Sequence, residues 1–186
     1  MSKRVCPWWL GYLLASPVRR WLSENPREIL QPYVRQGMTI FEPGPGMGFF
    51  TLELARLAGN SGRVIAVDVQ PRMIAGLKRR AARAGLQDRI EARVTAADSM
   101  GVSDLAGKVD FTLAFAMVHE MPSAGRFFSE TAEISKPGST LLLAEPRGHI
   151  TQPEFDAELQ EAAKAGFTVV QRPSIRRSHG ALLKKL

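Results

Sequence analysis

The feature that most restricts how this chain folds is a glycine-rich loop directly after a short apolar segment. Thr39–Phe41 predicts the buried end of a strand, and Glu42-Pro43-Gly44-Pro45-Gly46-Met47-Gly48 follows it. Apolar residues at helical spacing then predict a helix over 49–58. Glycines between a strand and a helix permit a tight turn and let the backbone approach a ligand closely. We therefore expect a strand–loop–helix unit with a ligand at the loop.

The spacing of the three glycines narrows the class of ligand. A dinucleotide fingerprint reads G-x-G-x-x-G, whereas Gly44, Gly46 and Gly48 give the shorter G-x-G-x-G. No Lys-Ser or Lys-Thr pair follows, so the loop is not a P-loop for nucleoside triphosphates. The unpaired N–H groups of the next helix add polar donors. The pattern favours a nucleoside-type ligand without a pyrophosphate.

An acidic residue ends the second predicted strand. Val64–Val67 is β-branched enough to be a strand, and Asp68 follows it, 20 residues after Gly48 (68 − 48). That separation places a carboxylate on the ribose of an adenosine ligand, where it accepts hydrogen bonds from the diol. The alternative role is a helix N-cap or a surface acid. The sequence favours the ribose role.

The rest of the chain alternates strands with helices. A helix is predicted from Pro71 to about Ala84, a second over 124–134, and a third that opens with a Thr151–Glu154 capping box and stops at Gly166. Lys136-Pro137-Gly138 is predicted to be a turn. The remaining predicted strands are 90–95, 109–115, 140–144, 167–170 and 181–183. Alternation of this kind indicates an α/β protein with a mostly parallel, Rossmann-like, doubly wound sheet.

Three motifs together resemble a known family. Glu42-x-Gly-x-Gly-x-Gly, Val64-Ile65-Ala66-Val67-Asp68, and Lys136-Pro137-Gly138 before an apolar strand are similar to the class I S-adenosylmethionine-dependent methyltransferases. The nearest group is the small type 11 and ubiquinone/menaquinone-biosynthesis enzymes, and the resemblance runs from about Tyr33 to the C-terminus. It implies S-adenosylmethionine as cofactor and a seven-stranded sheet whose last strand is antiparallel.

The resemblance also implies roles for individual residues. The glycines would line the methionine and ribose part of the cofactor, Glu42 would lie near its amino group, and Asp98 near its adenine. Pro43 and Pro45 depart from the family's usual loop, because proline removes N–H donors. The full cofactor-binding set that the resemblance implies is Glu42, Gly44, Pro45, Gly46, Gly48, Asp68, Val69, Gln70, Ala97, Asp98, Phe115 and Ala116.

The acceptor side is predicted to follow the strand over 109–115. His119 is the candidate general base, since its ordinary pKa is near 6.5. The alternative, a structural loop histidine, stays open. His149 and His179 stand alone, and no spacing predicts a metal site. The other residues expected on the substrate side are Met117, Val118, Glu120, Trp8 and Tyr12.

The composition limits the number of domains and the cellular location that we expect. Of 186 residues, 45% are hydrophobic and one is cysteine, which fits a single domain (1–186) in the cytoplasm and excludes a disulfide scaffold. No apolar run is long enough to span a bilayer. Residues 1–32 are interpreted as a helical cap of the mature protein and not a signal peptide, with 33–186 as the cofactor-binding core.

The net charge of the chain does not identify a binding partner. Lys and Arg number 25 against 18 Asp and Glu, which gives +7, but the basic residues are dispersed along the chain. A nucleic-acid partner is therefore possible without being favoured. The leading hypothesis is a methyltransferase for a small, partly apolar acceptor. The alternatives are a nicotinamide-dependent oxidoreductase and a non-catalytic RNA-binding module on the same fold.

Overall fold

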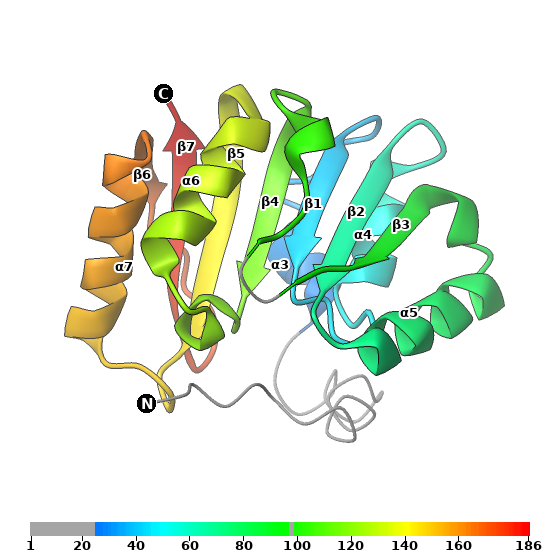
Figure 1. The fold of residues 1–186 in the computed structure, drawn as a ribbon, viewed down its shortest axis with the longest axis horizontal. Helices are drawn as coiled ribbons and strands as arrows, with labels where there is room; N and C mark the ends of the chain where they lie inside the picture. Colours follow the sequence, from blue (N-terminus) through cyan, green and yellow to red (C-terminus); the bar gives the residue numbers. More distant parts are fainter. Residues whose placement is uncertain (1–24, 97–98) are drawn as a thin grey trace. The chain divides into compact units, whose positions relative to one another are not determined.

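The computed structural model describes residues 25–96 and 99–186 (Figure 1). These residues fall into two compact units, which divide after Ala96. In each unit, strands alternate with helices as the sequence predicts. Over the described ranges, no helix is long and apolar enough to cross a membrane.

The first unit holds three parallel strands in the order β3-β2-β1. In Figure 1, α5 lies in front of these strands and α4 behind them. The strands β1 and β2 are buried at nearly every position, as expected for parallel strands that are covered on both faces. The elements are α3 (Pro26–Leu30), β1 (Thr39–Pro43), α4 (Thr51–Ala58), β2 (Arg63–Asp68), α5 (Pro71–Arg83), the 3-10 helix η1 (Gln87–Arg89) and β3 (Ile90–Val94).

The second unit holds four strands in the order β4-β5-β7-β6. The strands β4 and β5 are parallel, and β7 is antiparallel to both β5 and β6. The elements are η2 (Ser103–Leu105), β4 (Val109–Phe115), η3 (Val118–Glu120), α6 (Ala124–Ile134), β5 (Ser135–Pro146), α7 (Gln152–Lys164), β6 (Phe167–Gln171) and β7 (Ser178–Lys185). Seven strands with an antiparallel last one confirm the predicted fold class.

The predicted turn at Lys136-Pro137-Gly138 is wrong, because all three residues lie within β5. The pairing of β5 with β4 shifts there, from Ser135 opposite Val109 to Thr140 opposite Phe111. The extra residues on β5 form a bulge in which Gly138 has a φ of 76°. Pro and Gly therefore mark a break in the ladder rather than the end of a strand.

Other boundaries differ by smaller amounts. The helix predicted from residue 49 begins at Thr51, and β7 is longer than the predicted 181–183. The predicted capping contact before α7 is present, since a Glu154 carboxylate oxygen accepts the backbone N–H of Thr151 at 2.7 Å. A sequence pattern predicts the ends of a helix less accurately than its interior.

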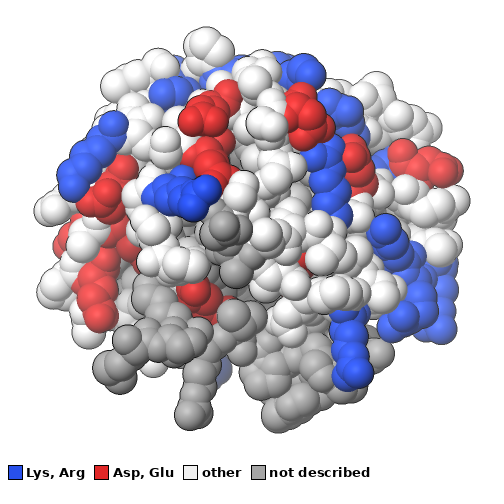
Figure 2. All heavy atoms as spheres, in the orientation of Figure 1, with Lys and Arg blue, Asp and Glu red and all other residues white. Residues whose placement is uncertain are grey.

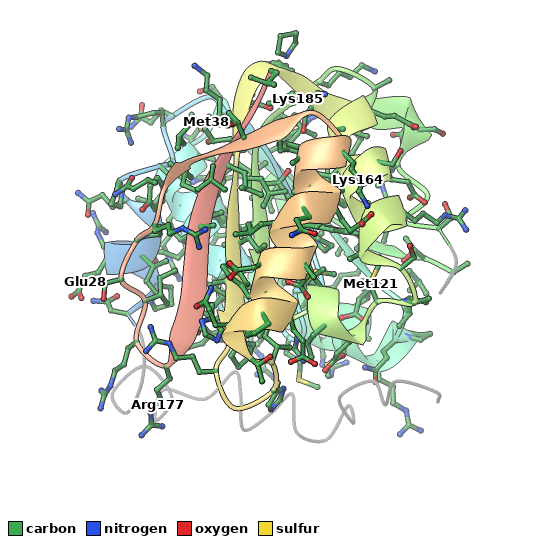
Figure 3. All side chains as sticks on the ribbon, turned by 90° about the vertical axis from the view of Figure 1, so that its left-hand side faces the viewer. Glu28, Met38, Met121, Lys164, Arg177 and Lys185 are labelled. Carbon is green, nitrogen blue, oxygen red and sulfur yellow. The ribbon has the colours of Figure 1, made fainter. Side chains whose placement is uncertain are left out.

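The turn that leads into β7 contains a residue in an unfavourable backbone conformation. Arg177 has a φ of 59°, a left-handed value that costs an L-residue roughly 1–2 kcal/mol. Two backbone hydrogen bonds hold the turn, from Ser178 N–H to the Ile175 carbonyl at 3.1 Å and from Arg147 N–H to the Arg177 carbonyl at 2.9 Å. In Figure 3, Arg177 points outward from the start of β7.

Glycine at this position should therefore stabilise the fold. We expect Arg177→Gly to raise the free energy of unfolding by about 0.5–1 kcal/mol, because the relieved strain exceeds the added chain entropy of glycine. Urea denaturation of both proteins measures the difference. A less stable variant would show that the arginine side chain contributes more than its backbone strain costs.

Candidate functional site

The glycine-rich loop of the first unit has the conformation that its sequence predicts. Gly44, Gly46 and Gly48 all have positive φ, at 68°, 54° and 84°. The Gly44 N–H donates to the Val67 carbonyl, and the Gly48 N–H donates to the Pro45 carbonyl, each at 2.9 Å. The loop is thus a tight turn tied to the end of β2, and each glycine occupies a conformation that other residues rarely adopt.

Helix α5 holds one side of this loop. A Cβ on Gly48 would lie 2.5 Å from Cδ1 of the fully buried Leu77, and a Cβ on Gly76 would lie 2.9 Å from Cγ of Met47. The Arg80 guanidinium donates to the Met47 carbonyl at 2.5 Å. By contrast, apart from Gly46 and its two chain neighbours, no atom of the described residues lies within 4 Å of a Cβ built on Gly46. The loop is therefore packed at Gly48 and open at Gly46.

Glu42, at the end of β1, is a buried carboxyl with an orphaned oxygen. The residue is 4% exposed, and burial raises its pKa to about 8, although the neighbouring Thr51 hydroxyl acts in the opposite direction. Neither Oε2 of Glu42 nor the Thr51 hydroxyl has a partner with hydrogen-bond geometry among the described residues. A buried carboxylate without a partner is costly, so a cationic ligand group beside it would compensate that cost.

Asp68 lies where the sequence predicts, at the end of β2. Its Oδ1 accepts the backbone N–H of Gln70 at 2.8 Å, which is a local Asx-type contact. The N-cap of α5 is Gln70 and not Asp68, so the alternative role as a helix cap does not apply. The ribose role remains a prediction.

In the second unit, the segment after β4 contains a strained residue. Ala116 has a φ of 56°, and its N–H donates to the Ala144 carbonyl of β5 at 2.7 Å. Met117 and Val118 are buried, and their N–H groups converge on one carboxylate oxygen, Glu145 Oε1, at 3.2 and 2.8 Å. Strained non-glycine residues that are fixed in this way are concentrated at functional sites.

The other oxygen of Glu145 contacts Nδ1 of His119. The second ring nitrogen of His119, Nε2, lies 3.1 Å from Nδ1 of His149 and 4.0 Å from a Glu120 carboxylate oxygen. Desolvation by burial opposes charging of His119, but the hydrogen bond to Glu145 and the charges of Glu145, Glu120 and Glu158 outweigh it and raise the pKa above 6.5. A histidine oriented by a buried carboxylate is the arrangement of a general base.

Two residues of this cluster are not among the sequence candidates. Glu145 lies one residue past the predicted strand 140–144, and it is completely buried. An acid that ends a buried strand is the signal that identifies Asp68, and it applies equally to Glu145. His149 is predicted to stand alone, which is wrong, because it contacts His119 across 30 residues of chain.

The structure describes some of the remaining predicted site residues and not others. Phe115 ends β4 and Val69 is 38% exposed beside Asp68. Ala97, Asp98, Trp8 and Tyr12 lie outside the described residues. Within the described ranges, no group of three His, Cys, Asp or Glu side chains is arranged to hold a metal ion.

Comparison with known proteins identifies the family. The family model of the methyltransferase domain matches residues 35–179, which is more than half of the chain. The chain belongs to this family. It is thus a member of the class I S-adenosylmethionine-dependent methyltransferases, as the glycine loop and Asp68 indicate.

Solved structures share the fold over almost the whole methyltransferase chain. A SAM-dependent methyltransferase from Aquifex aeolicus superposes with a TM-score of 0.85 at 22% identity, covering 98% of this chain and all of that one. A putative S-adenosylmethionine-dependent methyltransferase from Methanococcus maripaludis superposes with a TM-score of 0.77 at 15% identity, covering 100% of this chain and 97% of that one.

A curated relative matches part of the chain. The arsenite methyltransferase of Halobacterium salinarum is 27% identical over 109 residues, or 59% of this chain. The methyltransferase spans about a quarter of that relative's length, since the matched part is 27% of it.

The residues of the first unit fit S-adenosylmethionine. The orphaned oxygen of Glu42 suits the cationic amino group of the cofactor's methionine part, and the open position at Gly46 leaves room for a ligand against the backbone. The fit supports the predicted roles of Glu42 and Gly46, and substitution of either residue tests them.

The two glycines of the loop should respond differently to substitution. Gly48→Ala should lower the free energy of unfolding by about 2–4 kcal/mol, because a left-handed φ and a clash with Leu77 add together. Gly46→Ala should lower the free energy of unfolding by only about 1 kcal/mol but weaken binding of S-adenosylhomocysteine about tenfold or more. Denaturation and calorimetric titration measure both. Unchanged affinity in Gly46→Ala would place the ligand elsewhere.

The pKa of Glu42 predicts a pH-dependent affinity. If the ligand's ammonium group requires ionised Glu42, binding of S-adenosylhomocysteine should tighten by up to about tenfold per pH unit between pH 5.5 and 7.5, below the carboxyl's pKa of about 8. Calorimetric titration across this range measures the slope. Glu42→Gln, the control, should bind more weakly and with no slope. A flat profile in the unaltered protein would contradict the assignment.

Proposed function

We propose that this methyltransferase transfers the methyl group of S-adenosylmethionine to a small acceptor that must lose a proton. We propose further that His119 holds the positive charge after this proton is removed. The observation that supports the proposal is the contact between His119 and the completely buried Glu145. S-adenosylmethionine, when bound, supplies a methyl group that is already activated on a sulfonium. The protein therefore has to orient the acceptor and remove its proton.

Glu145 fixes the orientation and tautomer of His119. One carboxylate oxygen accepts two backbone N–H groups, from Met117 and Val118, so the carboxylate cannot turn away from the ring. A carboxylate only accepts hydrogen bonds, so the His119 Nδ1 that faces it carries hydrogen, and Nε2 is the basic nitrogen. The negative charge then stabilises the imidazolium that forms when His119 takes up a proton.

The first unit supplies the proposed donor site. We assign Glu42 to the amino group, Asp68 to the ribose, and Gly44, Gly46 and Gly48 to the backbone surface under the ligand. The burial and orphaned oxygen of Glu42 and the open space at a Cβ built on Gly46 support these roles. The same residues do not support the nicotinamide alternative, because their spacing lacks the dinucleotide pattern.

A small acceptor is favoured over a nucleic acid. On the face of the second unit shown in Figure 2, basic side chains lie next to acidic ones. Arg126 pairs with Glu130 at 3.0 Å and Lys164 with Glu161 at 2.5 Å, both on the surfaces of α6 and α7. Paired charges of this kind do not form the continuous basic surface that a phosphate backbone requires.

The curated relative raises a second candidate, arsenite. Thiolates are the ligands that soft elements prefer, and this chain contains one cysteine, Cys6, outside the described residues. The match covers about a quarter of that relative. An acceptor whose oxygen, nitrogen or acidic carbon carries a removable proton therefore fits the His119 site better than arsenite.

His119 substitution tests the proposal. His119→Gln should lower kcat by roughly 10²–10⁴-fold, as loss of a general base does, with the affinity for S-adenosylhomocysteine unchanged. In the unaltered protein, kcat should rise with pH through a midpoint above 6.5, because only neutral His119 accepts a proton. Glu145→Gln keeps an oxygen for Met117 and Val118 but removes the charge, so the midpoint should move downward.

A panel of small phenols, amines and carbon acids, assayed with S-adenosylmethionine, supplies the acceptor for these measurements. His179→Gln is a suitable control: its backbone pairs with that of Glu145 in the sheet, but its ring stacks on Phe155, and among the described residues no hydrogen bond joins it to His119, Glu145 or His149. Turnover of His119→Gln within about threefold of the unaltered enzyme would exclude the base role and leave orientation as the mechanism.

A further inference from the structure

A second imidazole, His149, lies on the loop between β5 and α7. The Pro146 carbonyl accepts the N–H of His149 at 2.9 Å and that of Ile150 at 3.1 Å, and Ile150 is buried. Glu145 immediately precedes this turn. The backbone that places the buried carboxylate therefore also places His149, four residues later, and fixes it at both ends.

Both ring nitrogens of His119 are already engaged. Nδ1 faces the Glu145 carboxylate, and Nε2 lies 3.1 Å from Nδ1 of His149. In neutral His119 the hydrogen is on Nδ1, so Nε2 is an acceptor and the hydrogen of the second contact belongs to Nδ1 of His149. The lone pair of neutral His149 is then on its Nε2, at the outer end of the chain of contacts.

Exposure differs between the two rings. The side chain of His119 is 14% exposed, whereas His149 belongs to the exposed residues of its loop. A solute therefore reaches the outer nitrogen of His149 more readily than either nitrogen of His119. The geometry resembles a triad with one additional imidazole between the carboxylate and the reacting atom.

We propose that His149 is the residue that meets the methyl acceptor, taking its proton at Nε2 and passing its own Nδ1 proton to His119 beside Glu145. This inference rests on the proposed function. The acceptor's X–H bond breaks and an N–H bond forms at His149 Nε2. With S-adenosylmethionine bound, the electron pair left on X would form the bond to the methyl carbon while the methyl–sulfur bond breaks, its electron pair staying on sulfur to give S-adenosylhomocysteine. The Nδ1–H proton of His149 moves to His119 Nε2, and no proton is created or lost.

The surrounding charges favour this direction of transfer. After the two proton movements His149 is neutral and His119 is the imidazolium, in contact with Glu145 and in the field of Glu120 and Glu158. Reversal of the transfer releases the proton to water from the exposed His149 after the methylated product leaves.

Nuclear magnetic resonance of the ¹⁵N-labelled chain tests the relay without any acceptor. Two imidazoles that share a proton titrate as a pair, so the ring signals of His119 and His149 should each show the same two midpoints. The neutral His149 ring should carry its hydrogen on Nδ1. In His149→Gln, His119 should titrate with one midpoint, whereas His179→Gln should leave the paired titration intact. Independent single titrations in the unaltered protein would overturn the relay.

Kinetics with an acceptor from the panel separate the relay from the proposed function. His149→Gln should lower kcat about 10²-fold or more at unchanged affinity for S-adenosylhomocysteine, and added imidazole should restore part of the activity of His149→Ala. If His149→Gln retains activity within about threefold while His119→Gln does not, the relay is wrong and the proposed function stands. If both variants retain activity, proton removal by this cluster is wrong altogether.

Discussion

The second unit depends on one carboxylate that is removed completely from water. Glu145 is the next-to-last residue of β5, and both of its carboxylate oxygens are satisfied, one by the backbone of Met117 and Val118 and the other by His119. An isolated buried charge would cost several kcal/mol, and these three donors offset that cost. The same contacts determine the path of the chain after β4, including the left-handed Ala116. One residue, Glu145, thus satisfies the hydrogen bonds of this segment and also orients His119, the base that we propose.

The first unit shows the opposite arrangement around Glu42. That carboxyl is nearly as buried, but it has an orphaned oxygen and a pKa of about 8. The fold satisfies one buried acid, whereas the other keeps an oxygen without a partner among the described residues, and we propose that a ligand satisfies it. Two acids near the ends of buried strands thus have different surroundings, and this difference is the basis of the different roles that we propose for them.

Sequence reasoning recovers the features that depend on local periodicity and backbone conformation. The strands, the helices, the glycine loop and Asp68 are all marked by patterns within about ten residues, and the order of these patterns identifies the family. The bulge at Lys136-Pro137-Gly138 is not marked in this way, because a proline and a glycine have the same signature in a turn and in an interrupted strand. Whether β5 ends there depends on its pairing with β4, which is a long-range property.

The site was predictable in part for the same reason. His119 stands out because it comes after a buried strand, but its partners are 26 and 30 residues away in sequence. A single sequence contains no signal that joins such residues. The rule that strand ends carry functional acids would have selected Glu145 had it been applied to every strand, whereas only the fold selects His149.

The short loop from Pro146 to Ile150 limits how this protein can change in length. It begins at the carboxylate and ends against the capped start of α7, so its five residues act as a fixed spacer between two rigid ends. One inserted residue would rotate the second imidazole away from the first, although exposed loops ordinarily accept insertions at little cost. Among homologous chains, length should therefore vary in the other surface loops and stay constant between β5 and α7.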